Sequence, residues 1–221
     1  PQRASVWMGA DVFVQRMGFT VQEKSAQCVR VQYRFGVPGV PGALVEMTYT
    51  VEAQGALRVE AAYHAVPGAP ELPCFGIKFE TAAPIVRTRW TGLSGETYPD
   101  RCKGGVFGCH EETPHIEPAL VPQDCGLHMD TQQVSLQLAD GKTMTLESTG
   151  ETFAFSALPN TAQQIEAAQH PCELPETGRT CVTVLGAARG VGGIDSWGTD
   201  VEEPYRLSGE QDHSVSFRIL L

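Results

Sequence analysis

The sequence predicts an all-β fold with one short helix. Apolar and polar residues alternate with a period of two in several segments, and two of these segments turn back on themselves at Gln54-Gly55 and Asp140-Gly141. A helical pattern occurs only near residues 161–169. No linker or repeat divides the 221 residues, so we expect a single domain over 1–221.

Residues 44–66 contain the clearest predicted hairpin, with its turn at Gln54-Gly55. One face of each strand is apolar and the other is polar, which is typical of a sheet with one buried face. The residues expected on the buried face are Val45, Met47, Tyr49, Val51, Leu57, Val59, Ala61 and Tyr63.

Further strands are predicted by the same alternation. Residues 134–148 form a second hairpin around Asp140-Gly141, a strong signal for a two-residue turn. Residues 28–35 and 213–221 are expected to be single alternating strands.

The helix over 161–169 has signals at both ends. Asn160 or Thr161 can cap its first turn, and Gln164 stands three residues after Thr161, which is the spacing of a capping box. Pro171 ends it.

Residues 101–129 lack periodicity, and glycines and prolines interrupt them, including Pro118 and Pro122. We expect a long irregular connection, and long connections are often functional. Six residues of the two types that most often bind zinc gather there, but their spacing lacks paired C-x2-C knuckles, so we expect buried thiols and surface imidazoles and no metal site. These residues are Cys102, Cys109, His110, His115, Cys125 and His128.

Composition and net charge limit the kinds of partner that we expect for the chain and its cellular compartment. The net charge of −10 argues against nucleic acid and anionic membranes, and no apolar run is long enough to span a bilayer. Seven cysteines are an odd number, which favours reduced thiols and a cytoplasmic location. The first residues carry no signal-peptide pattern and are typical of the interior of a longer polypeptide.

Common catalytic and cofactor motifs are missing from the sequence. Gly190-x-Gly192 begins a dinucleotide-type pattern, but Asp195 occupies the third glycine position and no βαβ unit surrounds it. No G-x-S-x-G elbow occurs, and paired acids such as Glu111-Glu112 are expected to be solvated. We therefore expect no catalytic residue and no cofactor in this chain.

The segment "GVGGIDSWG" (190–198) places Trp197 in a glycine-rich loop. The residue is either a core tryptophan at a strand end or an exposed aromatic platform. An indole face suits the C–H bonds of a sugar ring, and glycines let a backbone approach a ligand closely.

Five segments resemble large bacterial β-galactosidases of glycoside hydrolase family 2. The loop at 190–198 resembles "MGxGGDDSW", and "WTGLSGETYPDR" (90–101) resembles "WxGxGPxENYPDR". "PQDCGLH" (122–128) is similar to "PQENGxR", and the stretches "FSALPNTAQQIEAAQHPCEL" and "PYRLSGEQDHSVSFRI" follow in the family's order. The sequence departs from these patterns at Arg189, Ile194, Cys125 and His128.

This resemblance implies the C-terminal, fifth domain of such an enzyme, a β-supersandwich of the galactose-mutarotase type, here without its first strands. The implied partners are the other domains of the enzyme, with its catalytic (β/α)8 barrel, and a terminal β-D-galactoside; the parent enzyme can be a homo-oligomer. The family's two catalytic glutamates, about 5 Å apart, belong to the barrel.

By resemblance, Trp197 stacks on substrate and is exposed in the separate domain. Trp90, Tyr98, Asp100 and Arg101 match positions that we interpret as structural, with Trp90 buried. This chain alone should be inactive.

The alternative is a free-standing carbohydrate-binding or aldose-epimerase-like domain on the same fold. Such chemistry needs a histidine and a glutamate as acid and base. His64, His115 and His213 are available, but none lies in a mutarotase-like motif.

Overall fold

The computed structural model describes residues 4–116 and 125–221. Pro118, Pro122 and the first three residues of the 122–128 motif lie outside the described residues. The strands are β1 (Gln15–Lys24), β2 (Cys28–Gly36), β3 (Leu44–Glu52), β4 (Leu57–His64), β5 (Cys74–Glu80), β6 (Ile85–Leu93), β7 (Phe107–Glu112), β8 (His128–Thr131), β9 (Gln133–Leu138), β10 (Thr143–Ser148), β11 (Phe153–Leu158), β12 (Cys181–Ala188) and β13 (His213–Leu220). The helices are α1 (Ala10–Phe13) and α2 (Ala162–Ala167), with 3-10 turns at η1 (Ala4–Trp7), η2 (Pro171–Glu173) and η3 (Glu203–Tyr205).

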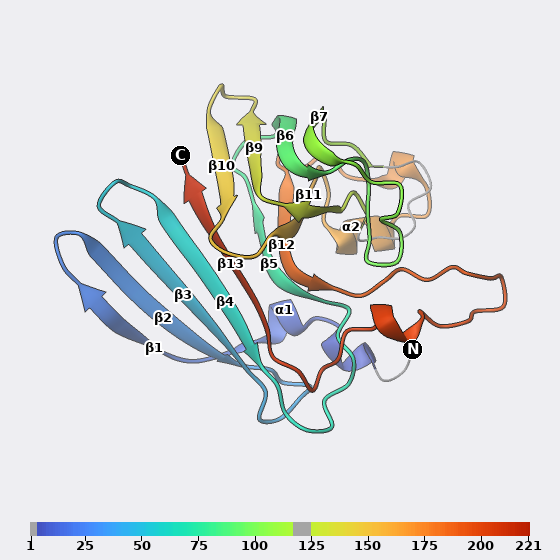
Figure 1. Cartoon of the computed structure of the whole chain (residues 1–221), viewed down its shortest axis with the longest axis horizontal. Coiled ribbons are helices and arrows are strands. Elements are labelled where there is room, and N and C mark those ends of the chain that lie inside the picture. The colour runs from blue at the N-terminus through green and yellow to red at the C-terminus, as the bar shows by residue number, and fades with distance from the viewer. Residues whose placement is uncertain (1–3, 117–124) are drawn as a thin grey trace.

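Over the described residues, the strands form two antiparallel sheets, which confirms the predicted all-β class (Figure 1). The large sheet has nine strands in the order β1-β2-β3-β4-β13-β10-β9-β6-β7, and the small sheet has four in the order β5-β12-β11-β8. The C-terminal strand β13 joins the two halves of the large sheet, because Phe217 pairs with Val59 of β4 and Ile219 with Leu146 of β10.

Both predicted hairpins are confirmed. β3 pairs with β4 across the turn at Gly55, and β9 pairs with β10 across Gly141. These glycines have φ of +86° and +87°, in the left-handed region where a side chain would be strained. The turns therefore set the register of both hairpins.

The core lies between the two sheets, and alternating residues of both inner faces fill it. In β4, the alternation of buried Val59, Ala61 and Tyr63 with half-buried neighbours matches the prediction. Figure 1 shows the small sheet behind the middle of the large one. Other buried members of this cluster are Val134, Leu136, Leu146, Phe153, Phe155, Val182, Val184 and Phe217.

The predicted burial of Val51 in β3 was wrong, although its face was right. Val51 continues the apolar face of Tyr49, but it stands one residue before the end of β3 and its side chain is exposed. Thr50, on the opposite face, is buried because Arg30 of β2 covers it and donates from Nε to its Oγ1 at 3.3 Å.

The predicted helix is α2, and Thr161 is its N-cap. The Thr161 hydroxyl accepts from the Gln164 backbone N–H at 3.2 Å, and the Gln164 side chain accepts from the Thr161 N–H at 2.9 Å, which completes the capping box. The helix buries Ile165 against Cys125 and Leu158. The four-residue helix α1 was not predicted.

The irregular connection predicted for 101–129 was wrong in part, since β7 and the start of β8 lie within it. β7 is an edge strand whose inward positions are Gly108, His110 and Glu112, so it carries no apolar alternation. The buried residues of β8 are His128 and Thr131, which are also polar. A hydrophobic pattern therefore could not reveal either strand.

The first strand leaves apolar side chains exposed. Met17, Phe19 and Val21 are between 51% and 66% exposed, and Phe19 contacts Tyr33 of β2 at a ring distance of 5.7 Å. Phe19 and Val21 lie on the face of the large sheet that carries Tyr33 and Val31, their partners in β2. Among the described residues, no helix is long and apolar enough to cross a bilayer.

Candidate functional site

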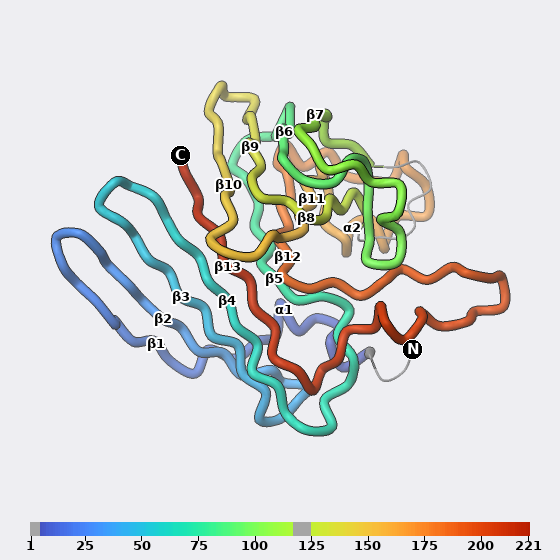
Figure 2. Tube along the Cα trace, in the orientation of Figure 1, coloured from blue at the N-terminus to red at the C-terminus, as the bar shows by residue number. Residues whose placement is uncertain are grey.

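Trp197 lies on the long loop that follows β12. This loop, orange-red in Figures 1 and 2, projects from the side of the molecule. The Trp197 side chain is 90% exposed, whereas Trp90 on β6 is 3% exposed. Both expectations about burial are confirmed, and Trp197 is not a core residue.

Asp195 organises the tip of the loop. Its Oδ1 accepts from the backbone N–H groups of Trp197 at 2.9 Å and Thr199 at 3.2 Å, and its Oδ2 accepts from the Thr199 hydroxyl. These bonds close a tight turn whose backbone carries the indole. The indole is thus presented outward from a hydrogen-bonded turn.

Charged side chains close the neck of the loop, where its two arms meet. Arg189 Nη2 lies 2.6 Å from Asp200 Oδ1, which joins the start of the loop to its end. Arg206 also reaches Asp200, at 3.5 Å, and Arg189 reaches Glu71 at 3.4 Å. Arg189 stands where the family pattern has Met, so this sequence closes the neck with an ion pair.

The segment Tyr98–Arg101, which follows β6, lies under the loop. Asp100 accepts from two backbone N–H groups of the loop, and Arg101 donates to the Gly192 carbonyl. A cavity of about 450 Å³ opens beside these contacts, and its lining includes Arg101, Lys103, Ile194 and Tyr205. Its lining also includes the carboxylates of Asp100 and Glu202, so the cavity offers charged groups of both signs together with apolar and phenolic surface close to the foot of the loop.

Three carboxylates of this region have lowered pKa values. Burial raises the pKa of Asp100, but N–H donation from Gly192 and Val191 and the charge of Arg101 outweigh it and leave the pKa lowered. Hydrogen bonds from Thr199 lower the pKa of Asp195, and a hydrogen bond from Arg189 lowers that of Asp200. All three therefore act as ionised acceptors that hold the loop.

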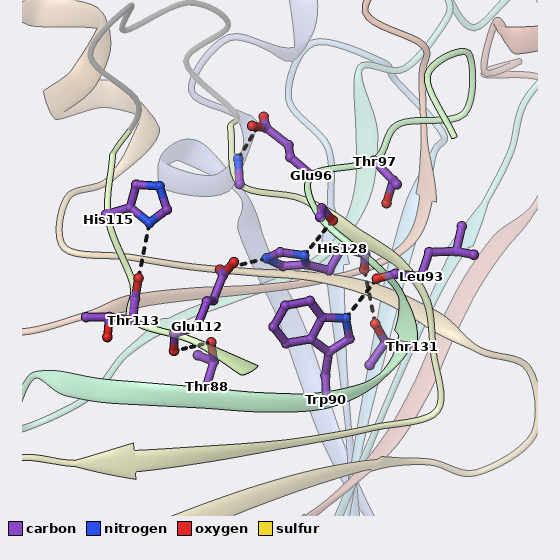
Figure 3. A network of polar contacts seen from close by, with 12 residues as sticks. Thr88, Trp90, Leu93, Glu96, Thr97, Glu112, Thr113, His115, His128 and Thr131 are labelled. Carbon is purple, nitrogen blue, oxygen red and sulfur yellow. Dashed lines mark hydrogen bonds and ion pairs between the residues drawn. The ribbon is translucent and has the colours of Figure 1, made fainter. Parts of the chain in front are cut away.

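Trp90 belongs to a buried network beneath the sheet edge (Figure 3). Its Nε1 donates to the Leu93 carbonyl at 2.9 Å, and its ring packs on His128, whose centroid is 4.2 Å away. His128 Nε2 lies 2.9 Å from Glu112 Oε1. Trp90 thus fixes the turn before Tyr98, which agrees with the structural role implied by the resemblance.

For the six residues of zinc-ligand type, the expectation of buried thiols and surface imidazoles was wrong at Cys109 and His128. His128 and Cys125 are buried, Cys109 is exposed with its Sγ 3.5 Å from Thr91 Oγ1, and His115 faces the Thr113 carbonyl. Within residues 4–116 and 125–221, no group of three or more His, Cys, Asp or Glu side chains is placed to hold a metal ion.

Of the histidines of the alternative hypothesis, His64 and His213 lie on neighbouring strands, because His213 pairs with Tyr63, the residue before His64. His64 ends β4, where its Nε2 lies 3.1 Å from Glu46, while His213 stacks on Tyr63 and faces the Ser208 carbonyl. His115 belongs to the segment after β7. Of these three histidines, His64 with Glu46 most resembles an acid–base pair, and the two residues lie on the polar face of the large sheet.

Sequence reasoning missed the contact between Asp100 and the loop, because 91 residues separate Asp100 from Val191. A motif match identified both segments but not their contact. The two motifs, 90–101 and 190–198, which sequence patterns treat as separate signals, therefore form one structural unit.

Sequence comparisons with known proteins agree on a family. The family model "Beta galactosidase small chain" matches residues 2–219. The chain is 40% identical to a β-galactosidase small subunit from Latilactobacillus sakei, over 99% of this chain and 78% of that protein. It is 33% identical to a β-galactosidase from Streptococcus thermophilus, over 86% of this chain but only 19% of that protein. A galactose mutarotase-like protein from Lactobacillus casei has a TM-score of 0.48 at 13% identity, over 91% of this chain and 72% of that one.

Proposed function

Since the chain belongs to the β-galactosidase small-chain family, we propose that it is the C-terminal part of a retaining β-galactosidase. In this proposal the chain packs on the catalytic barrel and contributes Trp197 to the binding of terminal β-D-galactosides. The catalytic carboxylates come from the barrel, so this chain alone is inactive. It holds no cofactor of its own and works in the cytoplasm.

The exposure of Trp197 is the observation that carries this proposal. An indole left in water costs about 2 to 3 kcal/mol relative to a buried one, so an exposed tryptophan suits a surface that a ligand or partner covers. Asp195 and Asp200 bind hydrogen-bonding groups of the loop and thereby hold it in shape. The indole faces therefore remain available for the apolar C–H groups of a sugar ring.

The exposed apolar side chains of β1 support the presence of a larger partner. Met17, Phe19 and Val21 form an apolar stripe of a kind that usually marks a contact surface. The chain also spans about a fifth of the length of the Streptococcus thermophilus β-galactosidase that it matches. We propose that the remaining parts of the enzyme cover this stripe.

The test uses the assembled enzyme, in which this chain is combined with the catalytic part from the same source. Trp197→Ala should lower kcat/KM for nitrophenyl β-galactoside roughly tenfold, since stacking and apolar burial of one ring are lost. Trp197→Phe should retain part of the activity. Unchanged kinetics in Trp197→Ala would remove the proposed role of this residue.

Two assays on the isolated chain separate the proposal from the alternative. Hydrolysis of nitrophenyl β-galactoside should be undetectable. Mutarotation of glucose and galactose should run at the uncatalysed rate, whereas an epimerase-like domain would accelerate it and would lose that activity in His64→Ala.

A further inference from the structure

The carboxylate of Asp100 bridges the foot of the Trp197 loop. Its side chain is 6% exposed and lies in the connection between β6 and β7. Oδ1 accepts from the Val191 N–H at 3.0 Å, and Oδ2 accepts from the Gly192 N–H at 2.7 Å. Each oxygen thus takes one of two consecutive backbone donors, so both the position and the direction of this backbone are fixed.

Gly190 allows the carboxylate to come this close. A Cβ at Gly190 would lie 2.7 to 2.9 Å from the carboxylate carbon and oxygens of Asp100, which is closer than real Cβ contacts. The Gly190 N–H donates to the Tyr205 carbonyl at 2.9 Å, so the glycine is held from its other side too. The first glycine of the motif is therefore needed for close approach.

Arg101 binds the same segment as a hydrogen-bond donor, whereas Asp100 binds it as an acceptor. Its Nη2 donates to the Gly192 carbonyl, while its Nη1 lies 3.8 Å from Asp100 Oδ2. Gly192 is thus held at its N–H by Asp100 and at its carbonyl by Arg101. Asp100 and Arg101 therefore hold one peptide segment from both sides.

We propose that Asp100 is a positioning residue for galactoside binding, which acts by orienting the loop that carries Trp197. This inference rests on the proposed function of Trp197. Four residues lie between Gly192 and Trp197, and Gly192 and Gly193 turn the backbone with φ of +69° and +68°. Asp195 then fixes the remaining turn, so a change of direction at Gly192 is passed on to the indole.

An amide cannot replace this carboxylate. Two N–H donors point at the two oxygens, and Asn offers one acceptor and one NH2 group. Asp100→Asn therefore leaves one backbone N–H facing another donor, although size and shape are kept. The substitution therefore removes one of the two hydrogen bonds to the loop without leaving a cavity.

The first measurement follows the loop in the isolated chain. Asp100→Asn should speed hydrogen exchange of the Val191 and Gly192 amides about tenfold, the factor expected for one lost charge-assisted hydrogen bond. The Trp197 indole N–H resonance should shift at the same time. Asp140→Asn is the matched control, since Asp140 accepts a comparable bond from Lys142 in the β9–β10 turn. Unchanged exchange and an unchanged indole signal in Asp100→Asn would overturn the proposal.

The second measurement is a double-mutant cycle in the assembled enzyme. Asp100→Asn should lower kcat/KM for nitrophenyl β-galactoside roughly threefold to tenfold, and this loss should vanish in a Trp197→Ala background. An equal loss in both backgrounds would overturn the proposal, because Asp100 would then act independently of Trp197. If Trp197→Ala alone has no effect, the proposed function fails, while the exchange data still decide whether Asp100 holds the loop.

Discussion

The imidazole of His128 packs against Trp90 with 4.2 Å between ring centroids and the two ring planes tilted by 43°. Both of its nitrogens face acceptors, Nδ1 the Gly95 carbonyl at 2.9 Å and Nε2 the Glu112 carboxylate at 2.9 Å. The two bonds tie β8 to the turn after β6 and to the edge strand β7 (Figure 3). His128 is therefore the link between three segments that surround the buried Trp90.

His128→Ala should destabilise the fold by roughly 2 to 4 kcal/mol, because it empties a buried site and leaves the Glu112 carboxylate without its partner. Urea denaturation measures the loss. His115→Ala is the control, since His115 is exposed, and its midpoint should stay within error of the unmodified chain. A neutral His128→Ala would mean that β7 and β8 are held by their backbone ladders alone.

Trp90 and Trp197 should respond differently to truncation. Trp90→Ala should cost about 3 to 5 kcal/mol of stability, as expected for a buried aromatic side chain. Trp197→Ala should change the free energy of unfolding by less than about 0.5 kcal/mol, because few packing contacts are lost. Thermal unfolding of both variants gives the comparison. A midpoint that falls by many degrees in Trp197→Ala would identify it as a packing residue.

Local signals in the sequence predicted the parts of the fold that local interactions determine. The hairpins at Gly55 and Gly141 and the cap at Thr161 depend on residues that are neighbours in the chain. β7 was not predicted because its inward residues, such as His110 and Glu112, are polar, and Glu112 is paired with His128, which is distant in sequence. Asp100 was recognised as structural, but its contact with Gly192 is non-local, and no spacing rule reports it.

Thr161 should contribute measurably through its cap. Thr161→Ala should lower stability by about 1 kcal/mol, because the Gln164 N–H loses its acceptor. Thr161→Ser keeps the hydroxyl and should stay close to the unmodified chain. Chemical denaturation of both variants measures the difference. Equal losses in the two variants would assign the effect to the methyl group instead of the cap.

Acid should loosen the Trp197 loop before it unfolds the sheets. The pKa values of Asp100, Asp195 and Asp200 are lowered in the folded chain. A carboxylate with a lowered folded pKa stabilises fully above its unfolded value, about pH 4, and this contribution is lost as pH falls through the folded pKa. Loop contacts should therefore weaken below about pH 4, as Thr199, Arg189 and the loop amides lose ionised acceptors.

Amide exchange across a pH series, corrected for the intrinsic rate, tests this expectation. The Val191, Gly192 and Thr199 amides should lose protection at a higher pH than amides of β13. If loop and β13 amides lose protection together, the three carboxylates do not control the loop separately.

Gly190→Ala tests why position 190 is glycine: because the Asp100 carboxylate approaches closely, or because the backbone needs the conformational freedom of glycine. The φ of Gly190 is outside the left-handed region, so alanine can adopt its backbone conformation, but the added Cβ would meet the Asp100 carboxylate. Gly150 is the matched control, since its φ is also unrestricted and a Cβ there meets nothing within 4 Å. Gly150→Ala should be neutral or stabilising by up to about 1 kcal/mol, because alanine reduces the entropy of the unfolded chain. Gly190→Ala should instead speed exchange of the Val191 and Gly192 amides and shift the Trp197 indole resonance, since the loop must move off the carboxylate. If Gly190→Ala matches Gly150→Ala in both readouts, close approach to Asp100 is not what requires the glycine.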